Sequence, residues 1–312
     1  MIIGRSPCIR RALVLTERYA RTRLPILVVG ATGTGKDLLA QYIHERSGRP
    51  GPFVDVNCWA LPRDMVESLL FGHRRGAFTG AVESTVGYVE RSDGGTLFLD
   101  ELAGLELSAQ GKLLRVLETG HVEVLGAGVK RRVDLRLVSA AQDTMASAVA
   151  TGRFRQDLFQ RLAGVLIELL PLAARPEDVM PLAEHFATAQ GRRLEPGVEK
   201  ELLSYGWPGN VRELSMAVER AGELEGNGTL SRSAVAEAIN LGQLSQGTSR
   251  DGSGLLRRHA LGRENVLAAL ARNDWDAKRT AADLGVGRTT LFKHLRALSL
   301  SLRAERKFTS TP

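Results

Sequence analysis

The sequence has few cysteines, few aromatic residues and no long apolar run. Its 312 residues include only two cysteines, Cys8 and Cys58, and 5% Phe, Trp and Tyr. The cysteines are fifty positions apart, without the paired spacing of a zinc site or a disulfide framework. No stretch reaches the roughly 18 apolar residues that a membrane helix needs, and the first residues lack the apolar core of a signal peptide. These absences predict a cytoplasmic protein without a membrane segment.

Positive charge is concentrated toward the C-terminus. The chain has a formal net charge of +7, and residues 251–312 alone contain 12 Lys or Arg against 6 Asp or Glu. A basic terminal segment predicts a polyanionic partner, for which DNA is the usual case. A solvated basic tail is the alternative, because charge alone does not separate the two.

Short apolar runs alternate with amphipathic stretches over residues 1–170. This alternation predicts an α/β domain in which a parallel sheet has helices on both faces. A helix over Pro7–Ala20 is expected to precede the first strand. The candidate strands are Ile26–Val29, Phe53–Asn57, Thr96–Leu99, Leu135–Ser139 and Val165–Leu169.

After Pro171 the strand pattern stops, so residues 171–241 are predicted to form an all-helical domain. Seven of the thirteen residues in 242–254 are Gly or Ser, which is typical of a flexible linker. A basic helical module is expected at 255–302, followed by a tail at 303–312. The candidate helices of the second domain are Pro176–Gln190, Val198–Ser204, Asn210–Glu225 and Ser231–Leu241.

A glycine-rich segment lies between the first predicted strand and a helical stretch. It consists of Gly30, Ala31, Thr32, Gly33, Thr34, Gly35, Lys36 and Asp37. In this context the pattern is that of a P-loop, whose glycines let backbone N–H groups surround phosphates and whose Lys reaches the β- and γ-phosphates of ATP. Asp37 stands where a hydroxyl residue usually binds Mg²⁺, and is itself a candidate metal ligand. A turn without a ligand is the alternative.

Two acids, Asp100 and Glu101, follow an apolar strand, and Asp100 lies 64 positions after Lys36. The carboxyl ends of parallel strands meet at one edge of a sheet, so Asp100 and Glu101 should lie beside the P-loop. Asp100 is the candidate Mg²⁺ ligand, directly or through water, and Glu101 the candidate base for the attacking water. A solvated turn is the alternative explanation of the acidic pair.

A loop of small residues with one aromatic and one hydroxyl side chain lies between these segments. Its residues are Gly76, Ala77, Phe78, Thr79, Gly80 and Ala81. Such a composition suits a mobile loop that presents Phe78 and Thr79 to a partner, although a buried turn is the alternative. The six letters GAFTGA match the signature of the bacterial enhancer-binding proteins, AAA+ ATPases that activate sigma-54 RNA polymerase. The chain resembles this family from about Ile3 to Leu241.

The resemblance implies an AAA+ P-loop domain with a helical lid, which uses ATP and Mg²⁺ and assembles into a hexamer. In the family, the GAFTGA loop contacts sigma-54, and hydrolysis converts closed promoter complexes into open ones. The acid usually found near Arg74 is replaced here by an Arg74-Arg75 pair.

Four further residues match positions with family roles. Asn57 resembles the Asn that restrains the catalytic Glu until the nucleotide state changes, with an ordinary helix cap as the alternative. Arg155 and Arg161 match the arginine fingers that reach the γ-phosphate of a neighbouring subunit, with surface salt bridges as the alternative. Arg212 resembles the second sensor, which faces the nucleotide phosphates.

The first sensor departs from the family pattern. The chain has Ala141-Gln142 where the family tends to have Thr-Asn, so a hydroxyl is lost and the amide is longer. This departure predicts slower or differently coupled hydrolysis, and leaves open a DNA-binding regulator whose ATPase is vestigial.

The basic C-terminal module contains the pattern of two crossing helices. Ala281, Gly285 and Leu291 have the spacing of a helix-turn-helix, which resembles the Fis-type module that closes most enhancer-binding proteins. A helical hairpin without DNA binding is the alternative. Dimer contacts are expected from the preceding helix, and the candidate DNA-contact residues are Arg288, Thr289, Thr290, Lys293, His294 and Arg296.

Only some 25 residues precede the first predicted strand. This resembles the stand-alone subclass of the family, which lacks an N-terminal regulatory domain, so control is expected from expression level, an inhibitory protein in trans or a paralogue in a hetero-oligomer. The expected partners are sigma-54 RNA polymerase and upstream enhancer DNA. An AAA+ remodeller of other proteins is a further alternative, against which the GAFTGA loop argues.

Overall fold

The computed structural model describes residues 2–128, 130–142, 144–226 and 228–247, together with Leu270 and Thr280. The chain divides into two units, Met1–Ala238 and Ile239–Pro312. The predicted helix-turn-helix with its six DNA-contact residues, the tail and the second half of the predicted linker lie outside the described residues. Within the described residues, no helix is long and apolar enough to cross a membrane.

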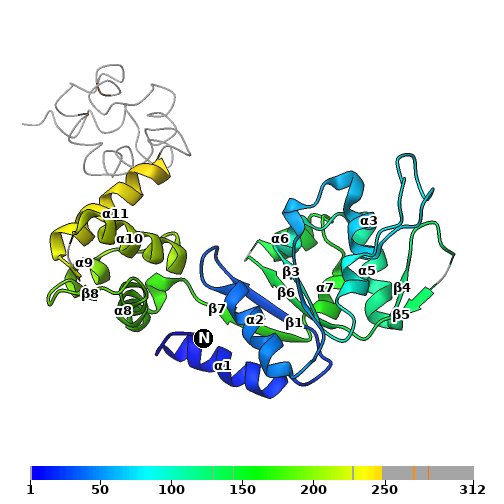
Figure 1. The fold of residues 1–312 in the computed structure, drawn as a ribbon, viewed down its shortest axis with the longest axis horizontal. Helices are drawn as coiled ribbons and strands as arrows, with labels where there is room; N and C mark the ends of the chain where they lie inside the picture. Colours follow the sequence, from blue (N-terminus) through cyan, green and yellow to red (C-terminus); the bar gives the residue numbers. More distant parts are fainter. Residues whose placement is uncertain are drawn as a thin grey trace, which may run out of the picture. The chain divides into compact units, whose positions relative to one another are not determined.

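Five parallel strands form the central sheet in the order β2-β3-β6-β1-β7 (Figure 1). The strands are β1 (Ile26–Gly30), β2 (Phe53–Asn57), β3 (Thr96–Asp100), β6 (Arg136–Ala141) and β7 (Val165–Leu169). The three central strands are buried along almost their whole length, which explains why they read as continuous apolar runs. The predicted parallel α/β sheet is confirmed, with strand ends shifted by at most two residues.

Helices cover both faces of the sheet (Figure 1). On one face lie α1 (Pro7–Tyr19) and α2 (Lys36–Ser47), and on the other α3 (Val66–Phe71), α5 (Leu107–Thr119), α6 (Met145–Ala150) and α7 (Gln156–Leu162). Neighbouring residues of β1 divide between the two cores: Ile26 and Val28 pack toward α1 and α2, whereas Leu27 packs toward the other set. This alternation is the period of two that a strand imposes on its side chains.

A small hairpin outside the sheet was not predicted. Its antiparallel strands are β4 (His121–Glu123) and β5 (Lys130–Arg132). Each strand has three residues and β5 is fully exposed, so neither shows an apolar alternation that sequence reasoning would detect. The remaining short elements of this region are η1 (Cys58–Ala60), η2 (Arg63–Met65), α4 (Tyr88–Arg91) and η3 (Leu102–Gly104).

The region after β7 is mainly helical, but not entirely so. Its elements are η4 (Leu172–Ala174), η5 (Pro176–Asp178), α8 (Val179–Ala189), β8 (Arg193–Leu194), α9 (Glu199–Ser204), α10 (Asn210–Leu224), β9 (Thr229–Leu230) and α11 (Arg232–Gly247). The expectation of an all-helical domain was wrong in one respect, since β8 and β9 pair in parallel over two residues each. The last helix was expected to end at Leu241 but continues to Gly247, because isolated Gly and Ser lower helix stability by only about 1 kcal/mol each or less. The first residues of the predicted linker are therefore helical.

Candidate functional site: a nucleotide pocket and an exposed loop

The P-loop connects β1 to α2. Gly33 and Gly35 have φ angles of 78° and 98°, in the left-handed region where a side chain is strained. Lys36 begins the helix and is only 6% exposed; its ammonium donates to the carbonyl oxygens of Gly30 at 2.9 Å and Ala31 at 3.2 Å. The ammonium therefore lies within the loop, where it can reach a phosphate.

The start of α10 holds the P-loop from the lid side. The Asn210 side-chain amide donates to the Thr32 carbonyl at 2.9 Å, and the Val211 N–H donates to the Gly33 carbonyl at 2.9 Å. A Cβ at Gly33 would lie 2.3 Å from the Gly209 carbonyl oxygen, so no larger residue fits between loop and lid. Because these loop carbonyls point to the lid, the loop N–H groups can turn inward toward an anion.

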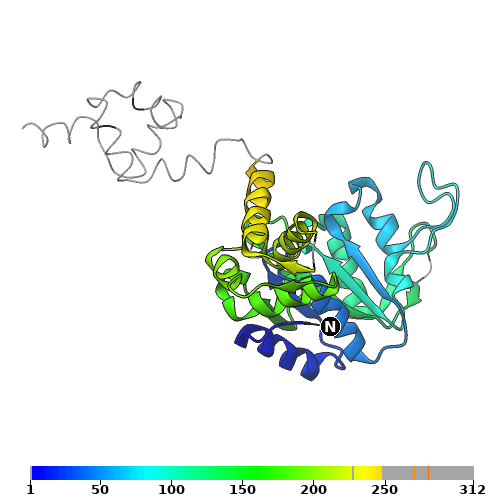
Figure 2. The ribbon, with the colours of Figure 1, turned by 60° about the vertical axis from the view of Figure 1, so that its left-hand side comes forward.

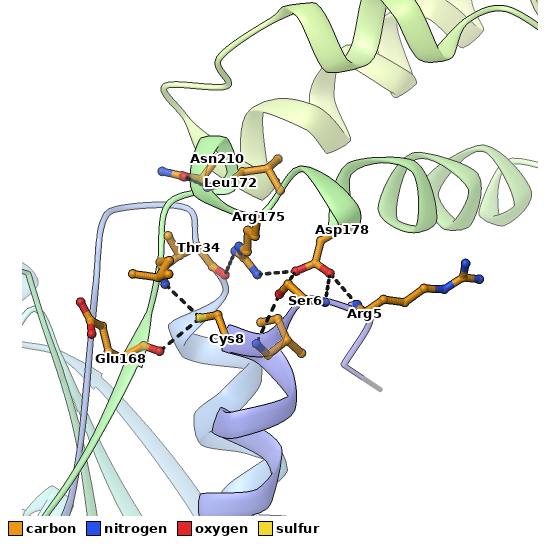
Figure 3. A network of polar contacts seen from close by, with 11 residues as sticks. Arg5, Ser6, Cys8, Thr34, Glu168, Leu172, Arg175, Asp178 and Asn210 are labelled. Atoms are coloured by element: carbon orange, nitrogen blue, oxygen red, sulfur yellow. Dashed lines mark hydrogen bonds and ion pairs between the residues drawn. The ribbon is translucent and has the colours of Figure 1, made fainter.

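A buried ion pair joins the lid to the P-loop and to the N-terminal segment (Figure 3). Arg175 donates to the Thr34 carbonyl at 3.0 Å and lies 3.7 Å from the Asp178 carboxylate. Asp178 also accepts from the Ser6 hydroxyl at 2.6 Å, the Ser6 N–H at 2.8 Å and the Arg5 N–H. Burial lowers the pKa of Arg175, and the Asp178 charge opposes this shift. Three segments distant in sequence thus meet at one pair.

An apolar pocket adjoins the C-terminal end of the P-loop. Aliphatic side chains from the N-terminal segment, α1 and α2 form it together with residues of α8, and Arg175 also lines it. Its position beside the loop and its apolar lining suit a flat aromatic base. Sequence reasoning missed this pocket, since its residues look like ordinary core positions; they include Ile2, Ile3, Ile9, Leu13, Leu38, Leu182, His185 and Phe186.

The two acids at the end of β3 lie beside the P-loop, as their spacing indicated. Burial raises the pKa of the Asp100 carboxyl; the Glu101 N–H, which donates to it at 2.9 Å, and the Lys36 ammonium oppose the rise, whereas the charges of Glu101 and Asp37 add to it. Asp55 belongs to the same group, since burial and the charges of Asp100 and Asp37 raise its pKa. Sequence reasoning missed Asp55, although the alternation along β2 places it on the same face as Asn57.

These acids could supply one or two ligands to a magnesium ion whose other ligands come from the nucleotide and water. Throughout the described part of the chain, no three His, Cys, Asp or Glu side chains meet closely enough to hold a metal by themselves. Mg²⁺ typically takes one or two carboxylates and completes its shell with phosphate oxygens and water. Asp100 and Asp37 fit that role.

The Glu101 carboxylate contacts a different side chain from the one expected. Gln142 donates through Nε2 to both carboxylate oxygens, at 2.9 and 3.1 Å. Asn57 accepts the Trp59 N–H at 2.9 Å and the Ala60 N–H at 3.3 Å, which is the helix-cap alternative. Among the described residues, no hydrogen bond joins Asn57 to Glu101.

The three candidate arginines have different surroundings. Arg212 is exposed in the first turn of α10, and its Cβ lies 3.3 Å from the position that a Cβ on Gly33 would take, so the structure places it beside the P-loop. Arg155 precedes α7 and pairs with Asp157 at 2.7 Å. Arg161 donates to the Leu117 carbonyl at 3.2 Å. Both finger candidates are exposed and available to a second molecule.

The GAFTGA loop is a tight turn at the end of an exposed segment. The Gly76 N–H donates to the Ala81 carbonyl at 2.9 Å, and the Ala81 N–H to the Phe78 carbonyl at 3.0 Å. Gly76 and Gly80 have φ angles of 80° and 101°, and no atom lies within 4 Å of a Cβ added at either position. Glycine is therefore favoured at both positions by the backbone conformation and not by a steric clash. The turn leaves Phe78 44% exposed.

Neighbouring segments support this loop at its base. The loop segment lies beside the β4–β5 hairpin in both views (Figures 1 and 2), and the Arg74 N–H donates to the Leu125 carbonyl at 3.0 Å. The Phe78 ring lies 5.0 Å from the His73 ring, and Nδ1 of His73 is 2.7 Å from the Ser68 hydroxyl. Phe78 therefore has an aromatic contact on one side and solvent on the other.

The parallel sheet, the P-loop after β1, the acids after β3 and a helical lid that holds the P-loop together define a P-loop NTPase of the AAA+ class. The chain belongs to the sigma-54 interaction domain family, which matches residues 2–168. An AAA+ ATPase lid domain matches residues 173–251.

Curated relatives are transcription regulators. The chain is 37% identical over 311 residues to the Nif-specific regulatory protein of Azotobacter vinelandii, covering 97% of this chain and 60% of the relative. It is 46% identical over 228 residues to the anaerobic nitric oxide reductase transcription regulator NorR of Citrobacter koseri, covering 70% and 45%. The chain thus spans between about half and 60% of the length of these relatives.

Solved structures share the fold. NtrX from Brucella abortus in complex with ATP is 30% identical with a TM-score of 0.67, covering 96% of this chain and 69% of that one. RuvB of Thermotoga maritima, at 15% identity and a TM-score of 0.56, shares the fold.

Proposed function

We propose that this protein is an ATPase that activates transcription by sigma-54 RNA polymerase. The observation that carries the proposal is the presence in one unit of a nucleotide pocket, with Lys36 buried in the P-loop, and an exposed GAFTGA turn. The family match to a sigma-54 interaction domain and the ATP complex of NtrX support it. Its proposed partners, RNA polymerase and DNA, place it in the cytoplasm.

In this proposal the P-loop and lid bind the nucleotide and the acids act on water. The loop N–H groups and Lys36 hold the phosphates, Arg212 approaches from the lid, and the apolar pocket takes the base. Asp100 would hold Mg²⁺, which would supply positive charge to the phosphates. Glu101 orients the attacking water and accepts its proton.

The two exposed arginines suggest that hydrolysis requires a second subunit. A guanidinium supplied in trans neutralises charge on the γ-phosphate, and we infer a hexamer in which Arg155 and Arg161 act on a neighbour. Arg155→Ala and Arg161→Ala should each lose turnover while still binding ATP. Mixing either with Lys36→Ala should restore part of the activity; normal assembly without any restoration would count against fingers acting in trans.

The decisive experiment measures open-complex formation on a sigma-54 promoter. Purified protein should convert closed complexes to open ones with ATP, and should fail with a non-hydrolysable analogue. Opening without hydrolysis would contradict the proposal. Truncation after Gly247 should leave the ATPase active but remove the response to an upstream enhancer, if residues 255–302 bind that DNA.

A DNA-binding regulator with a weak or vestigial ATPase is the second candidate. The specific observation in its favour is the altered first sensor, Gln142, which contacts Glu101. Turnover of ATP by the purified protein separates the two candidates, because a vestigial site binds nucleotide without releasing phosphate.

A further inference from the structure

An extended segment ahead of α1, residues 2–5, forms part of the apolar pocket that is proposed to take the base. Ile2 and Ile3 line the pocket from this segment, together with Thr34 and Gly35 of the P-loop. Residues 2–5 belong to no helix or strand, and within the described chain no hydrogen bond joins their main chain to another main-chain atom. Side chains must therefore hold this segment in place if the pocket is to be formed before a nucleotide binds.

Asp178 of the lid holds the end of this segment. Its buried carboxylate accepts the N–H groups of Arg5 and Ser6 through Oδ1, the second at 2.8 Å, and the Ser6 hydroxyl through Oδ2 at 2.6 Å. Gly4 packs directly against it, since a Cβ at Gly4 would lie 3.1 Å from both carboxylate oxygens and 2.9 Å from Ile9. Three hydrogen bonds and one close glycine contact thus join the segment to a single side chain (Figure 3).

The same carboxylate is paired with another residue of the pocket. Arg175 lines the pocket, lies 3.7 Å from Asp178 and donates to the Thr34 carbonyl at 3.0 Å. The side chains of Arg175 and Asp178 are 2% and 0% exposed, so solvent ions screen the pair little. Asp178 therefore connects the N-terminal part of the pocket to the loop that is proposed to bind the phosphates.

We propose that Asp178 is a positioning residue for base recognition: it holds residues 2–5 so that Ile2 and Ile3 line the pocket before ATP arrives. This inference deepens the proposed function and rests on it. A segment that is already ordered contacts the base without the entropy cost of ordering it during binding. Phosphate binding by the P-loop does not use the segment, so Asp178 acts on the part of ATP affinity that depends on the base.

The test compares ATP with inorganic tripolyphosphate, which has three phosphates and no base. Ser6→Ala removes one of the three hydrogen bonds, Gly4→Ala adds a methyl group against the carboxylate, and neither residue lines the pocket. Titration calorimetry with Mg²⁺ should show a dissociation constant for ATP about fivefold higher in both variants, and one for tripolyphosphate within about twofold of wild type. The matched control is Gly206→Ala, where an added Cβ meets no atom within 4 Å, and both constants should stay within about twofold.

Two results of this comparison would overturn the proposal. Unchanged ATP affinity in either variant would show that the contacts of Asp178 do not shape the base pocket. Equal weakening of ATP and tripolyphosphate would show that they act on the P-loop or on the whole fold.

Hydrogen exchange in the wild-type protein provides a measurement that needs no variant. The N–H groups of Arg5 and Ser6 should exchange at least about tenfold more slowly than in an unfolded peptide, because both donate to a buried carboxylate. Exchange at the peptide rate would also overturn the proposal. None of these measurements uses hydrolysis or promoter opening, so a protein that shows the expected binding constants but opens no promoter would contradict only the proposed function.

Discussion

The surroundings of the P-loop and the GAFTGA loop differ in burial and in the contacts that support them. Around the P-loop, buried polar groups from the N-terminal segment, the start of the lid and α10 meet within hydrogen-bond distance (Figure 3). The GAFTGA turn is closed mainly by its own backbone and leaves Phe78 and Thr79 exposed. The difference indicates that the first region is held rigid for chemistry, whereas the second is kept accessible for a partner.

The largest effects are expected inside the P-loop site. Lys36→Ala should weaken ATP binding roughly 100-fold, because it removes a buried cation from the phosphates. Glu101→Gln should leave binding nearly intact and reduce turnover about 10²- to 10⁴-fold, because only the base is lost. Equilibrium nucleotide binding and phosphate release measure the two quantities. Similar hydrolysis in either variant and wild type would contradict the assigned site.

The buried pair should matter far more for stability than an exposed one. Asp178→Ala leaves Arg175 buried without its counter-ion and should cost about 3–5 kcal/mol of unfolding free energy. The matched control is Glu201→Ala, which breaks the partly exposed pair with Arg232 and should cost less than about 1 kcal/mol. Urea denaturation gives both values, and equal losses would show that the network in Figure 3 does not stabilise this end.

Thr79→Ala tests the exposed GAFTGA turn. The hydroxyl is exposed on the turn, so its loss should leave ATP turnover within about twofold of wild type and reduce open-complex formation roughly 30-fold. Parallel assays of phosphate release and promoter opening measure the split. A joint decline of both activities would instead assign the loop a structural part in the ATPase.

The smallest effect is a difference between two glycines of the P-loop. Gly33→Ala and Gly35→Ala introduce similar left-handed strain, but only the first places a Cβ against the Gly209 carbonyl. Gly33→Ala should therefore be about 1–3 kcal/mol less stable than Gly35→Ala in urea unfolding. Equal stabilities would show that the lid does not press on the loop.

Much of the architecture was accessible from local patterns. The five strands were predicted within two residues of their ends because a buried parallel strand is a short apolar run that needs no knowledge of its neighbours. The β4–β5 hairpin and the short β8–β9 pair were not predicted, since strands of two or three residues are too short to show a period. The extension of α11 to Gly247 was missed because composition favoured a linker.

The sequence by itself determined the motifs: the P-loop ending in Lys36, the acids Asp100 and Glu101 after a strand, and the GAFTGA turn. Each depends on residues within about ten positions, where chain geometry alone relates them. Only the tertiary structure showed that Asp178 binds Ser6, 172 residues away, and that Gln142 donates a hydrogen bond to Glu101. Such contacts depend on strand order and register, which are set by the packing of the whole sheet and leave no local pattern in the sequence.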